Sequence, residues 1–287
     1  MMSKHIVGLL GFYASLERPL TFLEIQRLTS YTLPSEDLLK ILDELVKEKN
    51  IICSEGFYSL SGYKILERKW QDALLDKKWR KLMRLRSFFS LLPFVNFVFI
   101  SGSLALGNVH EHSDFDVLIG CKEGRVFTAR FFSNVLFILI RKRREAFYGK
   151  DRICLNHYIT PSSYALKKPY ALYPPLIASL VPFYGSKEEM DKFIKANRLT
   201  FLKNGDRRFI GSERRLIAIL IEKMLKGTLG DMFERLIKRL QIPRIRAFLK
   251  SQHVISQDGI ILSDKEIELH PNTKKIENIV QKQVEYS

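Results

Sequence analysis

The residues with the clearest chemical potential are two small residues and two aspartates. Gly102 and Ser103 follow a buried-strand pattern at 96–100, and Asp114 and Asp116 come about ten residues later. Glycine lets the backbone approach a phosphate, and the serine hydroxyl adds a hydrogen-bond donor. Aspartates two residues apart on a strand leave the same face. Because Mg²⁺ binds through one or two carboxylates and phosphate oxygens, the pattern predicts a Mg²⁺ or Mn²⁺ site beside a phosphate group.

The spacing of these residues resembles the signature of the nucleotidyltransferase superfamily that includes DNA polymerase β. That signature is Gly-Ser or Gly-Gly after a hydrophobic residue, a short spacer, and Asp-x-Asp between hydrophobic residues. Ala105, Gly107 and Ser113 match the version found in the smaller enzymes. The resemblance covers about residues 96–160, under a quarter of the chain. It implies an α/β (α+β) nucleotidyltransferase core with a mixed sheet.

The resemblance also implies a reaction and a set of site residues. The reaction is Mg²⁺-dependent transfer of a nucleoside monophosphate from an NTP to a hydroxyl acceptor, with release of pyrophosphate. Asp114 and Asp116 would be the catalytic and metal-binding residues. The implied nucleotide- and phosphate-binding residues are Gly102, Ser103, Gly107 and Ser113. The acceptor is unidentified and could be a protein, an RNA or a small molecule.

Active members of the superfamily usually carry a third carboxylate on a following strand. The strand expected at 152–160 alternates so that Ile153, Leu155 and Ile159 share the buried face, which places Asn156 at the third position. An amide is no general base near neutral pH. Three readings stay open. In the first, the substrate or the solvent acts as the general base. In the second, the carboxylate of Asp151 or Glu111 moves into the site and acts as the base. In the third, the site binds a nucleotide and catalyses no reaction.

Other polar residues near this run have plainer interpretations. His110 and His112 could bind zinc only with further ligands, so we expect exposed loop residues or residues that contact the nucleotide. His157 falls on the apolar face and is expected to be a hydrogen-bonded core residue. The run 141–144 is entirely basic, and contact with a triphosphate or nucleic acid is as plausible as a solvated helix end.

The chain around this segment divides by pattern and charge. The first sixty residues carry six basic and eight acidic side chains, although the whole chain has a net charge of +16. A polyanion-binding surface is therefore expected elsewhere. The expected divisions are a winged-helix-like domain at 1–62, a basic linker helix at 63–90, the nucleotidyltransferase core at 91–170 and a mainly helical C-terminal domain at 171–287.

The winged-helix prediction rests on three short helices followed by a hairpin. Thr21 and Glu24 form a capping-box pattern, Ser35 is expected to cap the third helix, and strands are expected at 51–54 and 57–60. The third helix is rich in acidic residues, which is unfavourable against DNA phosphates. A protein partner or a dimer contact is therefore favoured over DNA reading.

Two further classes of function compete with the enzyme. One is a nucleotide-binding pseudoenzyme that acts as a regulatory protein, and the other is a nucleic-acid-binding module that uses the basic run at 77–86. No membrane role is expected, because the apolar stretch 126–140 is too short for a span. Three scattered cysteines without CxxC spacing, and no signal-peptide pattern, favour the cytoplasm.

Overall fold

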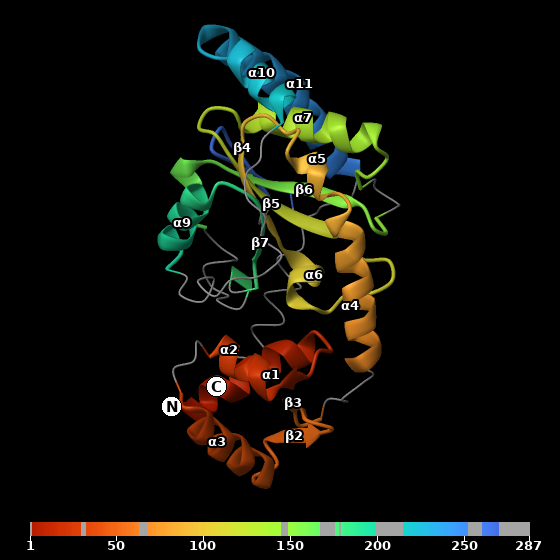
Figure 1. Ribbon diagram of the computed structural model, residues 1–287, viewed down its shortest axis with the longest axis vertical. Coiled ribbons are helices and arrows are strands. Elements are labelled where there is room, and N and C mark those ends of the chain that lie inside the picture. Colours follow the sequence, from red (N-terminus) through yellow and green to blue (C-terminus); the bar gives the residue numbers. More distant parts are fainter. Residues whose placement is uncertain are drawn as a thin grey trace.

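The computed structural model describes residues 2–29, 33–62, 68–144, 149–166, 176–177, 179–198, 215–251 and 260–269. A small N-terminal unit of helices and strands lies at one end, and a larger α/β unit lies at the other (Figure 1). Helix α4 (Arg68–Met83) runs from the small unit along the side of the large one. The fold is therefore mixed α/β, with the sheet of the large unit at its centre.

The N-terminal unit contains three helices and a three-stranded sheet. The capping box predicted at Thr21 is formed, because its side chain accepts from the Glu24 amide and the Glu24 carboxylate accepts from the Thr21 amide. Ser35 makes no capping bond, and Pro34 occupies the N-cap instead. The elements are α1 (Met2–Ser15), β1 (Leu20–Thr21), α2 (Phe22–Leu28), α3 (Ser35–Lys47), β2 (Ile51–Ser54) and β3 (Phe57–Leu60).

The large unit is built on a six-stranded mixed sheet with the order β7-β4-β5-β6-β9-β8. Only β5 and β6 pair in parallel, and every other neighbouring pair is antiparallel. A parallel pair needs a crossover connection, which α7 (Val126–Leu139) supplies as the expected buried helix. The strands are β4 (Val95–Ile100), β5 (Phe115–Cys121), β6 (Ile153–Ile159), β7 (Val181–Gly185), β8 (Ile260–Leu262) and β9 (Glu266–Leu269).

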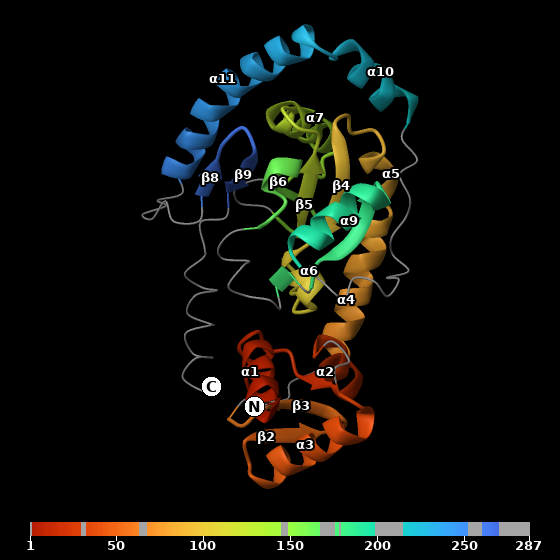
Figure 2. The same cartoon turned by 90° about the vertical axis from the view of Figure 1, so that its left-hand side faces the viewer.

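Each face of the sheet has its own apolar core. One face carries side chains such as Val98 and Ile119, which pack with residues of α4, α5 (Arg86–Phe89), α7 and α11 (Thr228–Ser251). The opposite face carries Phe97, Phe99 and Leu118, which pack with α9 (Lys187–Ala196). Figure 2 shows α11 and α10 (Leu216–Met224) across the end of the sheet farthest from the N-terminal unit. Two layers of helix thus cover one central sheet.

The chain after residue 170 differs from the expected helical domain. It supplies β7, β8 and β9, and β7 and β9 extend the sheet by pairing with β4 and β6. Short strand runs between polar segments carry a weak periodicity signal, so the sequence pattern missed them. Helix α11 also continues through Pro243, a residue type that usually ends or kinks a helix. The helix expected at 272–284 lies outside the described residues. Among the described helices, none combines the length and apolarity needed to cross a bilayer.

Strand β6 departs from simple alternation because its register with β5 shifts. Asp116 is opposite Cys154, but Leu118 is opposite His157, so β6 contains one extra residue between these pairs. After this bulge the inward and outward positions exchange. Tyr158, expected on the polar face, is therefore fully buried in the same core as Ile153 and Leu155. Ile159 packs in the core on the opposite face.

Candidate functional site

The two aspartates lie where β5 begins, in the middle of the large sheet. Asp114 directly precedes the strand and Asp116 is its second residue. The backbone amide of Ser101 donates to the Asp116 carbonyl at 3.0 Å, and the Phe115 amide donates to the Arg152 carbonyl at 2.8 Å. Residues directly next to β4 and β6 thus hydrogen-bond to the backbone of Phe115 and Asp116 and fix its position. Both side chains are partly buried, and the Oδ2 atom of Asp114 has almost no exposed surface.

Gly102 brings the backbone of the next segment against one of these carboxylates. It opens the short helix α6 (Gly102–Leu106) with a φ of +62°, a conformation that favours glycine. A Cβ atom at this position would lie 2.1 Å from Oδ2 of Asp116. Glycine is therefore required both for the backbone angle and for the close approach. The structure thus places Gly102, the first residue of the expected phosphate-binding pair, against Asp116.

Cys154 of β6, rather than Asn156, is the residue opposite Asp116. The Cys154 sulfur and one carboxylate oxygen each from Asp114 and Asp116 all lie within 4.8 Å of one another. Burial raises the pKa of the Cys154 thiol well above its ordinary value, and the charges of Asp116 and Asp114 raise it further. The third position of the site is therefore a neutral thiol. Asn156 falls in the bulge that separates the two registers.

Arg144 places a positive charge directly at the site. One of its guanidinium nitrogens lies 2.8 Å from Oδ2 of Asp114 and donates to the sulfur of Cys154 at 3.4 Å. Partial burial lowers the Arg144 pKa, but Cys154 and the two aspartates outweigh it, so the pKa is raised overall. Of the basic run 141–144, this residue is the one that the structure brings to the carboxylates.

Lys78 of α4 holds the loop that leads into Asp114. Its ammonium group donates to the carbonyls of Glu111 at 2.9 Å and Ser113 at 2.6 Å, and lies 3.2 Å from Oδ1 of Asp151. The side chain is only 2% exposed, and burial lowers its pKa. Lys78 was expected to belong to a basic surface. The structure instead assigns it to positioning this loop.

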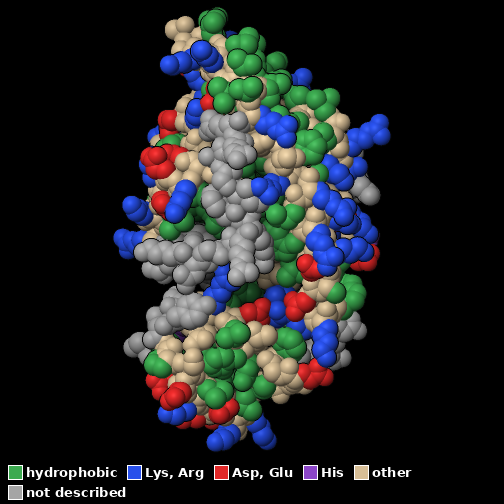
Figure 3. Space-filling view, in the orientation of Figure 1, with side chains coloured by type: hydrophobic (Ala, Val, Ile, Leu, Met, Phe, Trp, Pro, Cys, Tyr) green, Lys and Arg blue, Asp and Glu red, His purple; other side chains and the backbone are tan. Residues whose placement is uncertain are grey.

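Several other basic residues on or directly after α4 face outward, although Arg68 at the start of the helix is buried. Lys77, Arg80 and Arg84 are exposed, and basic side chains gather along the edge of the molecule where α4 runs (Figure 3). The spacing of apolar residues along the helix could have shown that Lys78, unlike these exposed residues, lies on the buried face. It lies four residues from Leu74 and from Leu82, which are both buried, so it belongs to the apolar stripe of the helix.

The two acids considered as alternative bases are engaged by lysines. Asp151 contacts both Lys78 and Lys81. Burial alone would raise the Asp151 pKa, but hydrogen bonds from these lysines hold it below the ordinary value. Glu111 is exposed and lies 3.4 Å from the Lys150 ammonium group. Asp151 is therefore ionised at neutral pH and tied to α4.

Gly107 and Ser113 have contacts that differ from those of Gly102. The Gly107 carbonyl accepts from Arg18 of the N-terminal unit at 2.6 Å, and a Cβ atom here would lie 2.4 Å from the Arg18 Cζ. The Ser113 hydroxyl accepts from the His110 amide at 2.9 Å. Gly107 thus contacts the junction between the units, and Ser113 shapes the loop before Asp114.

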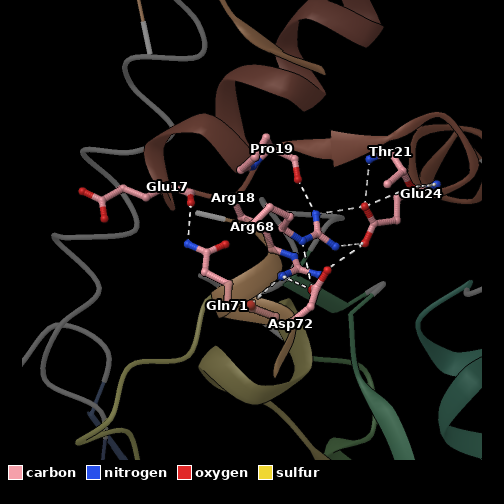
Figure 4. Close-up of polar contacts among 9 residues, drawn as sticks. Glu17, Arg18, Pro19, Thr21, Glu24, Arg68, Gln71 and Asp72 are labelled. Atoms are coloured by element: carbon pink, nitrogen blue, oxygen red, sulfur yellow. Dashed lines mark hydrogen bonds and ion pairs between the residues drawn. The ribbon is translucent and has the colours of Figure 1, made fainter. Parts of the chain in front are cut away.

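The junction between the two units is a network of buried charges (Figure 4). Arg68 lies 2.7 Å from Glu24 and 2.9 Å from Asp72, and it also donates to the Pro19 carbonyl. Arg18 lies 3.2 Å from Glu24 and 3.5 Å from Asp72. Arg68 and Asp72 form an i,i+4 pair on α4, whereas Glu24 lies 44 residues before Arg68, and nothing in the local pattern indicated that these two segments meet.

The histidines have the environments expected of them. His110 and His112 are exposed in the loop before Asp114. His157 is 2% exposed, and its Nε2 lies 3.3 Å from Oε1 of Glu266 on β9. The hydrogen-bonded core position predicted for His157 is therefore confirmed.

The donor set at the aspartates suits a hard divalent cation. Carboxylates at this separation match the oxygen ligands that Mg²⁺ and Mn²⁺ take in proteins, whereas a thiol is a poor ligand for Mg²⁺. Asp114 and Asp116 fit such an ion, and Cys154 does not add to its ligands. No family model, no curated protein and no solved structure matches this chain.

Proposed function

We propose that this protein is a Mg²⁺-dependent nucleotidyltransferase that moves a nucleoside monophosphate from an NTP to a hydroxyl acceptor. The observation that supports this most is the meeting of Asp114 and Asp116 with the tight backbone at Gly102. A backbone without a Cβ beside two carboxylates is the arrangement needed to bring phosphate oxygens and a divalent cation together.

Each part of the site has a role in this reaction. Asp114 and Asp116 would hold the metal, and the Gly102-Ser103 segment would contact the β- and γ-phosphates. The bound Mg²⁺ would neutralise charge on the transferred phosphoryl group. The acceptor oxygen forms a bond to the α-phosphorus, the bond to the bridging oxygen breaks, and pyrophosphate leaves. Because the Cys154 thiol is neutral, the acceptor proton would pass to solvent or to the substrate.

The N-terminal unit has the helix and strand order of a winged helix, and we include that identity in the proposal. Its third helix, α3, exposes acidic residues on the surface. Charge of this sign repels nucleic acid and is compatible with a basic protein partner. The exposed acidic residues of α3 are Glu36, Asp37, Asp43, Glu44 and Glu48. The unit would therefore serve as a docking or dimer module.

A nucleotide-binding pseudoenzyme is the second candidate. It is favoured by the thiol at the position where active relatives of the superfamily carry a third carboxylate, and by the arginine already bound to Asp114. A protein of this kind would bind an NTP and Mg²⁺ without releasing pyrophosphate.

Calorimetric titration of each NTP, with and without Mg²⁺, tests these candidates when a pyrophosphate-release assay is run on the same samples. Asp116→Asn is compared with Asp76→Asn, which alters an exposed acid on α4. The proposal expects Mg²⁺-dependent binding that Asp116→Asn weakens at least about tenfold, a loss of about 1.4 kcal/mol, and that Asp76→Asn leaves unchanged. Binding without pyrophosphate release favours the pseudoenzyme. Absence of binding in the parent protein contradicts both.

A further inference from the structure

The guanidinium of Arg144 lies at the point where the donor atoms of the site converge. It is 2.8 Å from Oδ2 of Asp114 and 3.4 Å from the sulfur of Cys154. Those two residues and Asp116 place their donor atoms within 4.8 Å of one another. A cation is thus already present among the groups that would hold a metal.

The backbone around Arg144 is fixed to the strand beside the site. Its amide donates to the Ile153 carbonyl at 2.9 Å, and the Ile153 amide donates to the Lys142 carbonyl at 2.7 Å. The side chain is nevertheless 44% exposed. The guanidinium can therefore turn toward solvent while the backbone stays paired, which gives Arg144 two positions at little structural cost.

Arg144 and a divalent cation make competing demands on Asp114. The guanidinium keeps its positive charge at all accessible pH values, and at 2.8 Å it forms an ion pair with a carboxylate that the metal also needs. Gly149 packs against both partners, because a Cβ atom there would lie 3.6 Å from the Arg144 Nε and from the Asp114 Cβ. A guanidinium charge at this distance repels a divalent cation that approaches the same carboxylate, so the arginine and the metal compete for Asp114.

We propose that Arg144 is an internal competitor of the divalent cation at Asp114, and that the triphosphate of a bound nucleotide relieves the competition by accepting the guanidinium. This inference rests on the proposed function. Arginine binds phosphate through two parallel hydrogen bonds, so the triphosphate is a suitable acceptor. Nucleotide and metal then bind with positive coupling. The triphosphate draws the arginine away from the carboxylate that the metal needs, and the metal releases the arginine that the triphosphate binds.

Mn²⁺ binding, followed by electron paramagnetic resonance without nucleotide, tests the competition directly. Arg144→Gln removes the competing charge, and Arg141→Gln removes an equal charge from a neighbouring exposed residue. Arg144→Gln is expected to bind Mn²⁺ about tenfold more tightly than the parent protein. Arg141→Gln and Arg144→Lys are expected to stay within about twofold, because the first keeps Arg144 and the second keeps a cation. Equal Mn²⁺ affinity in Arg144→Gln and Arg141→Gln overturns the inference.

A second titration measures the coupling. A non-hydrolysable NTP analogue should raise the Mn²⁺ affinity of the parent protein, and it should raise that of Arg144→Gln much less. Equal increases overturn the relief by triphosphate. If no variant and no parent sample binds Mn²⁺ with or without the analogue, the inference and the proposed function both fail. If Mn²⁺ and NTP bind but Arg144→Gln changes neither, only the inference fails.

Discussion

Arginines face carboxylates in two regions of this molecule, and the two arrangements differ in burial. At the junction, Arg18 and Arg68 are 7% and 5% exposed and contact both Glu24 and Asp72. At the candidate site, Arg144 is 44% exposed and lies against Asp114 and a thiol. The two buried arginines and their two acids are expected to stay paired in the folded protein, whereas the half-exposed Arg144 can move away from Asp114 into solvent.

Backbone acceptors account for part of the difference. The Arg18 guanidinium donates to the Gly107 carbonyl and the Arg68 guanidinium donates to the Pro19 carbonyl, so both bonds cross from one segment to another. A buried charge that loses its partners has a high desolvation cost. A solvated charge loses little when it moves. The junction is therefore expected to control stability, and the site is expected to control ligand binding.

Removing the central arginine of the junction should have the largest effect. Arg68→Ala removes a buried guanidinium and its contacts with Glu24, Asp72 and the Pro19 carbonyl, while Arg18 still pairs with both acids, so we expect about 3 kcal/mol less free energy of unfolding. Urea denaturation measures this change. Arg80→Ala, which removes an exposed pair with Asp76 on the same helix, should cost less than about 1 kcal/mol. Similar losses in both variants would contradict the structural role of the junction.

Gly102→Ala tests the close approach at the site. The positive φ alone costs an alanine about 1–2 kcal/mol, and contact with Asp116 adds to this, so we expect a total of about 2–3 kcal/mol. Gly56→Ala is the matched control, because Gly56 has a φ of +79° but nothing within 4 Å of the added Cβ. Thermal unfolding compares the two variants. Equal losses would mean that Asp116 does not restrict position 102.

The pH dependence of stability distinguishes the charged junction from an uncharged contact. Burial alone would raise the Glu24 pKa, but hydrogen bonds from Arg68 and from the Thr21 amide hold it below the ordinary value of 4.5. A lowered pKa stabilises the fold above about pH 4.5, and this stabilisation is lost as the pH falls through the folded-state value.

Glu24→Gln should therefore destabilise the protein by about 2 kcal/mol at pH 7, and the difference from the parent should shrink below pH 4.5. Urea titrations at a series of pH values measure it. A difference that does not change with pH would show that the carboxylate charge contributes nothing at the junction.

The smallest expected effect concerns the third position of the site. Cys154→Asp adds a carboxylate beside Asp114 and Asp116, so we expect Mn²⁺ affinity to rise about tenfold, or about 1.4 kcal/mol. Cys154→Ser controls for loss of the thiol and should leave the affinity near that of the parent. Electron paramagnetic resonance gives both values. No gain for Cys154→Asp would mean that β6 does not face the metal position.

Local pattern predicted the elements whose residues interact with near neighbours in the chain. The capping box at Thr21, the hairpin at 51–60 and the buried helix at 126–140 depend on contacts within one or two turns, and each is present. The later strands failed this test. Strands β7 and β9 pair with strands far away in the chain, and the short β8–β9 hairpin carried no clear strand pattern. Strand β9 is recognisable mainly through its pairing with β6, about a hundred residues earlier.

The sequence by itself predicted that the Gly102-Ser103 segment and Asp116 would face the same site, from the motif that resembles the nucleotidyltransferase signature, and the structure places Gly102 against Asp116. Only the tertiary structure decided which groups surround the aspartates. The register of β6 against β5 places Cys154, and not Asn156, opposite Asp116. Chain folding over long distances brings Lys78 and Arg144 to the loop that leads into β5. Strand register and the meeting of distant charges depend on the whole packed sheet, and no local pattern encodes them.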